Sequence, residues 1–255
     1  MKRRLPLLLI ACSFMIFSFT GEKKSKTYWY KAADNQGYIS LERTVNEKGQ
    51  PILKTTVKAN FDQEKLDFSL TTTCDTDKML NASKMYFDGT IDSNMDAVNF
   101  TGNRVKTTKR ASFWHFSGDY KNRMSPDPEV KQFIESEHKS SIRVPSTTIP
   151  SFNILAIVPN LEFDKKGTFK FNSLDEMKLH VKKNQTINYL GKVKENVDGT
   201  EQELHKFVHQ GKGMKAAYYW VNDAKELVKI KLDGKFVFTL SKKEAILQAN
   251  VAVGN

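Results

Sequence analysis

The feature that most constrains the fold of this chain is a two-residue alternation of apolar and polar side chains. Between residues 53 and 61, apolar residues and one threonine hold the odd positions, and polar residues hold the even ones. The same alternation runs through 67–72, 177–182, 228–232 and 236–240. A period of two is typical of strands that bury one face. The sequence therefore predicts a mainly β protein with an antiparallel sheet.

Short turn signals separate these segments. They are rich in Asn, Asp and Gly, which tolerate positive φ, and they lie at Asn35–Gly37, Asn46–Gly49, Asp88–Gly89, Gly211–Gly213, Asp198–Gly199 and Asp233–Gly234. Their spacing of about 8–15 residues is typical of a meander. We expect about six strands before residue 120 and about six after residue 165.

Two segments depart from the alternation. Asp127, Pro128 and Glu129 resemble the start of a helix. Val130, Phe133 and Ile134 follow at helical spacing, and His138 and Lys139 suit its C-terminal end. The segment from Pro150 to Pro159 is apolar nearly all round, so a helix formed there must be buried on most sides. The predicted fold is an antiparallel curved sheet or half-barrel wrapped around one or two short helices.

The N-terminus has the layout of a secretory signal peptide. Lys2, Arg3 and Arg4 precede an apolar run from Leu5 to Phe19, and small or polar residues follow. The run is shorter than the roughly 18–20 residues needed to span a bilayer, and no later segment comes closer. We therefore expect residues 1–20 to be a signal peptide and the mature chain to have no transmembrane span.

The processing of this signal leaves alternatives open. Cleavage after Thr20 would release a soluble protein into the periplasm or cell envelope, and this is the alternative we favour. Residues 9–12 (Leu-Ile-Ala-Cys) also match a bacterial lipobox, which would lipidate Cys12 and anchor the protein. However, the apolar run continues past Cys12, whereas a lipobox should close it. An uncleaved N-terminal anchor is a third alternative.

Composition fits one globular unit. The 255 residues are 39% hydrophobic, enough for a packed core, so we expect residues 21–255 to form a single β-rich domain. A boundary between two half-sheets would fall near 121–150.

The net charge is +11, and removing Lys2, Arg3 and Arg4 leaves 37 basic against 29 acidic residues, or +8. The surplus lysines are dispersed and suit a solvated sheet face; attraction to anionic lipid or polysaccharide is the alternative. We expect no nucleic-acid partner.

Candidate chemistry is sparse. The nucleophile elbow, Walker loop, zincin helix and dinucleotide fingerprint are absent, so we expect no catalytic residue and no cofactor. His205 and His209 read as members of one strand, about 13 Å apart on the same face, which is too far to share a metal. Cys74 would be the only thiol after cleavage at Thr20, and we expect it to be a buried small residue.

An aromatic cluster suggests a cavity. If Lys215 marks the solvent face of its strand, Met214, Ala216, Tyr218 and Trp220 point inward. Core packing is the simpler interpretation of this cluster. The alternative is the wall of a hydrophobic ligand cavity, and the candidate ligand-binding residues are then Phe152, Leu155, Tyr218 and Trp220.

The block from about Val144 to Leu240 resembles a widespread group of exported bacterial proteins of unknown function. It shares the Pro-bounded apolar segment, the motif Tyr-Trp-Val-Asn-Asp at 219–223 and the strand at 227–230. The group is thought to have the half-barrel architecture of the lipoprotein carriers of the Lol system. The resemblance implies that fold, and it implies no active site.

These observations favour an exported, non-enzymatic cell-envelope protein that binds or carries an apolar or amphiphilic ligand. The alternative is a structural or assembly factor of the envelope that binds a protein partner. A cavity inside the sheet would favour the first, and a filled interior with an exposed apolar patch would favour the second.

Overall fold

The computed structural model describes residues 25–61, 64–77, 80–90, 98–119, 132–136, 139–162, 167–176, 179–232, 234–243 and 246. The expected signal peptide, with its cleavage site and Cys12, lies outside these ranges.

The described chain is mainly β, as the alternation predicted. Its strands are β1 (Lys26–Ala32), β2 (Gly37–Val45), β3 (Pro51–Phe61), β4 (Glu64–Cys74), β5 (Ala82–Thr90), β6 (Val98–Thr107), β7 (Ala111–Asp119), β8 (Gln132–Ser136), β9 (Lys139–Pro145), β10 (Thr148–Pro150), β11 (Thr168–Asp175), β12 (His180–Val197), β13 (Thr200–Gln210), β14 (Ala217–Val221), β15 (Leu227–Leu232) and β16 (Phe236–Ser241). Four short helical turns accompany them, namely η1 (Ala33–Asn35), η3 (Ser151–Asn153), α1 (Ile154–Ile157) and η4 (Val158–Asn160).

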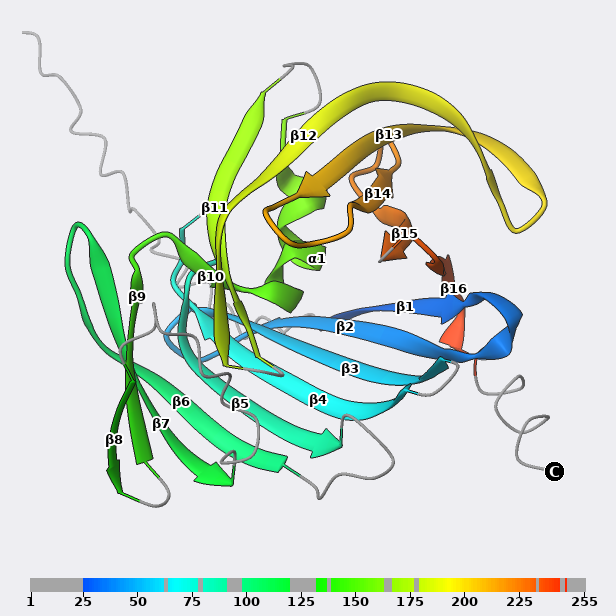
Figure 1. Ribbon diagram of the computed structural model, residues 1–255. Coiled ribbons are helices and arrows are strands. Elements are labelled where there is room, and N and C mark those ends of the chain that lie inside the picture. The colour runs from blue at the N-terminus through cyan, green and yellow to red at the C-terminus, as the bar shows by residue number, and fades with distance from the viewer. Residues whose placement is uncertain are drawn as a thin grey trace, which may run out of the picture.

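All these strands belong to one 16-stranded sheet in the order β10-β11-β12-β13-β14-β15-β16-β1-β2-β3-β4-β5-β6-β7-β9-β8. Neighbouring strands pair antiparallel except β10 and β11, which are parallel. The sheet curves strongly and nearly closes around α1 (Figure 1). The first strand pairs with the last, with Tyr30 opposite Leu240, and this seam joins the two ends of the meander. The expected fold class, a curved antiparallel sheet around a short helix, is therefore confirmed.

The buried helical segment lies where the sequence predicted it. Ile154, Leu155, Ala156, Ile157 and Val158 are all buried, because this segment packs inside the curve of the sheet. Asn153 ties the segment to β4: its side-chain oxygen accepts a hydrogen bond from Thr72 Oγ1 at 3.0 Å, and its Nδ2 donates to the Leu80 carbonyl at 3.0 Å.

The prediction of a helix from Asp127 onward is wrong for the residues of this segment that the structure describes. Residues 132–136 form strand β8, which pairs antiparallel with β9. The ladder with β9 satisfies backbone groups that a short isolated helix would leave to water, and a helical pattern of so few positions is weak evidence. Residues 120–131 lie outside the described ranges.

The turn signals were only partly reliable. Asp198 and Gly199 form the β12–β13 hairpin, both with positive φ (49° and 83°), as expected. Gly89, by contrast, lies inside β5 at φ 144°, opposite Phe68. A Cβ at Gly89 would lie 2.3 Å from Phe68 Cα, so glycine there allows a close approach of two strands.

Part of the interior is filled by an aromatic ladder. Phe68, Phe87, Phe100, Phe116 and Trp114 contact one another in that order across β4 to β7, with ring centroids 5.1, 5.3, 5.9 and 6.0 Å apart. Such cross-strand aromatic pairs stabilise a sheet beyond the area they bury. The ladder reaches the helical segment, because the rings of Phe68 and Phe152 lie 5.4 Å apart.

Candidate ligand-binding cavity

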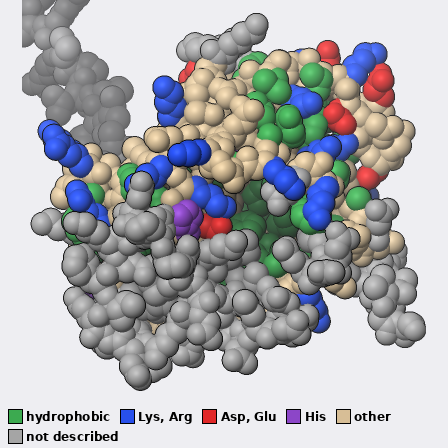
Figure 2. Space-filling model, viewed as in Figure 1, with side chains coloured by type: hydrophobic (Ala, Val, Ile, Leu, Met, Phe, Trp, Pro, Cys, Tyr) green, Lys and Arg blue, Asp and Glu red, His purple; other side chains and the backbone are tan. Residues whose placement is uncertain are grey.

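A cavity of about 280 Å³ lies between the helical segment and the inner face of the sheet. Its apolar wall includes Ile39, Val57, Phe152, Leu155, Tyr219 and Phe236. Figure 2 shows a hollow with hydrophobic side chains on this face of the molecule, flanked by Lys and Arg side chains. The volume lies near the lower end of the range for small-molecule sites.

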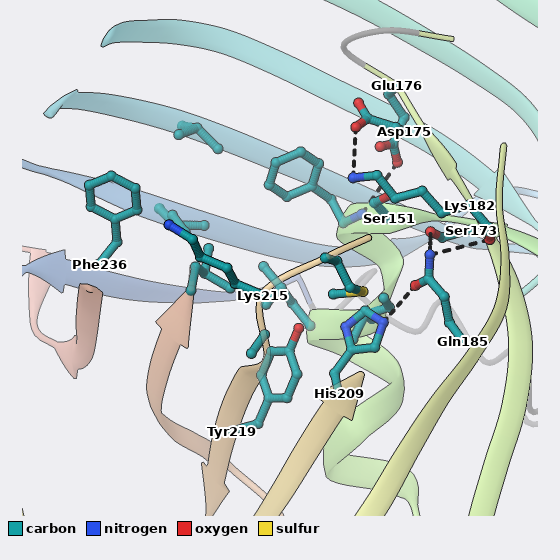
Figure 3. A pocket seen from close by; sticks show the side chains of 18 of the residues that line it. Ser151, Ser173, Asp175, Glu176, Lys182, Gln185, His209, Lys215, Tyr219 and Phe236 are labelled. Atoms are coloured by element: carbon teal, nitrogen blue, oxygen red, sulfur yellow. Dashed lines mark hydrogen bonds and ion pairs between the residues drawn. The ribbon is translucent and has the colours of Figure 1, made fainter. Parts of the chain in front are cut away.

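One end of the cavity is polar. Asp175 and Glu176 come from the end of β11, Lys182 and Gln185 from β12, and His209 from β13. Figure 3 shows these side chains gathered around Ser151 and Ser173, with Tyr219 and Phe236 farther away. An apolar wall with a few convergent polar groups is the usual composition of a ligand site.

Glu176 is the most unusual group in this cavity. Its exposed fraction is only 1%. Its Oε1 accepts a hydrogen bond from the Phe152 backbone N–H at 3.3 Å, while its Oε2 is buried and has no hydrogen-bond partner within the described ranges. Burial raises the pKa of the Glu176 carboxyl to about 8, because an ionised carboxylate is poorly stabilised away from water. Glu176 is therefore protonated at neutral pH.

Asp175 and Lys182 form an ion pair beside Glu176. Lys182 Nζ lies 2.9 Å from Asp175 Oδ2. The Lys182 side chain is 41% exposed whereas that of Asp175 is 7% exposed, so the pair reaches from the surface into the cavity.

A hydrogen-bonded chain connects β11, β12 and β13. Gln185 Nε2 donates to Ser173 Oγ at 2.8 Å, which leaves Gln185 Oε1 to accept from His209 Nε2 at 2.6 Å. This network assigns the proton of neutral His209 to Nε2. Burial and the nearby Lys182 charge lower the pKa of His209 to about 4, so the imidazole is neutral near pH 7.

Two of the four predicted cavity residues line this cavity. Phe152 and Leu155 do so from the helical segment. Tyr218 and Trp220 lie on the opposite face of β14, and Ala217 and Tyr219 line the cavity instead. The predicted facing was wrong because β14 begins at Ala217: Lys215 precedes the strand, so it does not mark a strand face, and it lines the cavity itself.

Trp220 belongs to a second, smaller core on the outer face of the sheet. It packs there with Val197, Leu204 and Val228. The tip of the long β12–β13 hairpin folds over this core, where Lys229 Nζ lies 2.8 Å from Glu195 Oε1 and Thr239 Oγ1 donates to Asp198 Oδ1 at 3.0 Å. Figure 1 shows this hairpin curving over β14 and β15.

We expect Trp220→Phe to reduce stability by about 1–2 kcal/mol, because the smaller ring leaves space beneath the hairpin. The ammonium groups of Lys206 and Lys229, 5.1 and 5.5 Å from the Trp220 ring, also lose their stronger π partner. Urea unfolding measures this loss. Binding of an apolar probe in the cavity should stay at the wild-type level, and weaker binding by the folded variant would contradict this placement of Trp220.

The two histidines lie on one strand, as expected, but in different surroundings. Tyr189 Oη and Asp223 Oδ1 each lie 2.8 Å from a ring nitrogen of His205, whereas His209 faces the cavity. Among the described residues, no group of three or more His, Cys, Asp or Glu side chains is placed to hold a metal ion. Cys74 is fully buried, as predicted.

Sequence reasoning missed the polar end of the cavity. Asp175 and Glu176 read as part of a strand-to-turn boundary, and Gln185 carries no motif. The available signal was the adjacency of two acidic residues to the apolar residues of 169–174, which is weak by itself.

The comparisons with known proteins add no relative. No family model, curated protein or solved structure matches this chain. Within the ranges described above, no helix is long and apolar enough to cross a membrane. The features that bear on its function are a nearly closed β sheet and an amphiphilic cavity inside the curve of that sheet.

Proposed function

We propose that this chain is an exported cell-envelope protein that binds or carries an apolar or amphiphilic ligand in this cavity, without catalysing a reaction. The observation that carries the proposal is the cavity itself, which joins a mainly apolar wall to a cluster of buried polar groups. A folded protein keeps such an unfilled apolar space at a cost in packing, and a ligand would recover those contacts.

The architecture supports the same proposal. A strongly curved sheet with a short helical segment inside it has an interior in which a ligand can be enclosed. The proposed location, the periplasm or cell envelope, is inferred from the N-terminal sequence alone.

The alternative, an assembly factor that binds a protein partner, receives less support from the surface. The large hydrophobic side chains that are exposed in the described ranges are Val45, Tyr86, Val105 and Leu190, which lie on four different strands. Scattered apolar side chains of this kind are normal on a protein surface.

We expect the purified protein to bind the neutral probe N-phenyl-1-naphthylamine saturably, with a rise in probe fluorescence. Ala217→Leu should abolish most of this binding, because Ala217 is buried against the cavity and the added atoms occupy its space. Tyr218→Phe is the matched control, since the neighbouring side chain lies on the outer face and its replacement should leave probe binding unchanged. Circular dichroism and thermal melting would establish that both variants are folded. Wild-type binding by a folded Ala217→Leu variant would overturn the proposal.

A further inference from the structure

We propose that the ligand is a single-chain amphiphile with an anionic oxygen head group, and that this head group accepts a hydrogen bond from Glu176 at the polar end of the cavity. The inference rests on the proposed function and specifies its ligand. It depends on three properties of the cavity: an unpaired buried oxygen, the sign of the surrounding charge and the available space.

The first property is the hydrogen-bonding state of Glu176. No cationic side chain of the described residues forms an ion pair with its carboxyl, since the neighbouring Lys182 Nζ is paired with Asp175. A buried carboxyl without a cation adopts its neutral form. Because Oε1 already accepts the Phe152 N–H, the proton belongs on Oε2. Oε2 then presents an O–H donor that has no acceptor among the residues that the structure describes, and a ligand oxygen would satisfy it.

The second property is the charge of the groups that line the cavity together with Glu176. These groups are Asp175 on β11, Lys182 on β12, His209 on β13 and Lys215 before β14. Asp175 and Lys182 compensate each other, and His209 is neutral because its pKa is lowered. The walls contributed by η3, β2, β3 and β16 are uncharged at Ser151, Phe152, Ile39, Val57, Phe236 and Phe238.

Because of Lys215, the side chains that line this cavity carry one more positive charge than negative charges. It is exposed, and the described residues offer it no carboxylate within ion-pair distance. Low-dielectric walls around a charge of one sign favour a ligand of the opposite sign. An anionic head group meets both requirements, whereas an ammonium head group would meet neither.

The third property is the available volume. About 280 Å³ between Ile39, Val57, Leu155 and Phe236 is small for a ligand site. This space suits one acyl chain rather than the several chains of a membrane phospholipid or a lipoprotein anchor. A free fatty acid and a single-chain phosphate monoester share the required chemistry.

The test is isothermal titration calorimetry of the full chain at pH 7 with four twelve-carbon amphiphiles: dodecanoate, dodecyl phosphate, dodecylamine and dodecanol. We expect dodecanoate or dodecyl phosphate to bind about tenfold or more tightly than dodecylamine and dodecanol. The tighter of the two anions identifies carboxylate or phosphate as the head group.

Two variants assign the selectivity to Glu176. Glu176→Gln keeps a neutral N–H donor and should retain anion binding within about threefold, whereas Glu176→Met removes the donor and should weaken it about tenfold. Raising the pH from 7 to 9 ionises Glu176 in the wild type, whose pKa is raised to about 8, so anion binding should weaken. The Glu176→Gln variant should show no such decrease, and this comparison holds even if Glu176→Met does not fold.

The outcomes separate the two proposals. Equal binding of all four amphiphiles, or tighter binding of dodecylamine, would overturn the head-group inference and leave the ligand-binding function in place. Failure of all four, together with failure of the neutral probe, would overturn the ligand-binding function itself.

Discussion

We expect Ile157→Asp to abolish cooperative folding. Ile157 is 1% exposed, belongs to the hydrophobic core and does not line the cavity, so an aspartate there is buried among apolar side chains. An uncompensated buried carboxylate costs on the order of 4 kcal/mol, a large part of a total stability of roughly 5–15 kcal/mol. Thermal unfolding followed by near-ultraviolet circular dichroism measures the effect.

Ile157→Val is the matched control for this variant. It removes one methylene from the same position and should cost about 1 kcal/mol, leaving a cooperative transition. Wild-type-like melting of Ile157→Asp would show that the helical segment is not enclosed by the sheet, and the architecture described above would then be wrong.

The second large effect is a loss of stability as the pH rises from about 4.5 to 8. Glu176 has an ordinary pKa of 4.5 and a folded-state pKa of about 8. Between these values the unfolded chain has released this proton while the folded protein retains it, so the unfolded state binds fewer protons. The free energy of unfolding should therefore fall as the pH rises from about 4.5 to 8, by on the order of 5 kcal/mol, and then level off.

His209 acts in the opposite direction at acidic pH. Its pKa falls from 6.5 to about 4 on folding, so its contribution is present above pH 6.5 and is lost as the pH falls toward 4. Between pH 4.5 and 6.5 the two groups oppose each other, and above 6.5 only the Glu176 effect remains.

Urea unfolding across pH 4 to 9 tests this pair of effects. Subtracting the curve of Glu176→Gln from that of the wild type should isolate the loss between pH 4.5 and 8, and His209→Gln should isolate the loss between pH 6.5 and 4. A pH-independent difference between the wild type and Glu176→Gln would mean that Glu176 is not buried as described.

The strands could be predicted from the sequence because many of them bury one face. A buried face requires apolar side chains at every second residue. The alternation shows which side chains of a strand point inward only when the residues at which the strand begins and ends are known. Lys215 lies before β14, so counting from it inverted Tyr218 and Trp220 relative to Ala217 and Tyr219.

The polar end of the cavity could not be predicted in the same way. Glu176, Gln185 and His209 lie on or next to three strands and meet because of the pairing register, which the sequence does not state. Phe152 and Leu155 could be predicted because one short segment contains both, and its lack of a polar face already required burial.

The seam between β1 and β16 has a consequence for the order of events as the chain folds. Phe236 and Phe238 line the cavity from the last strand, and Ile39 lines it from the second. The pairing of Tyr30 with Leu240 joins segments at opposite ends of the polypeptide, so it is among the slowest contacts to form. A chain emerging from a ribosome or a membrane channel with its N-terminus first has most of its meander available before this wall exists. The wall of the cavity should consequently be completed late and abruptly, when this single terminal strand pairs with β1.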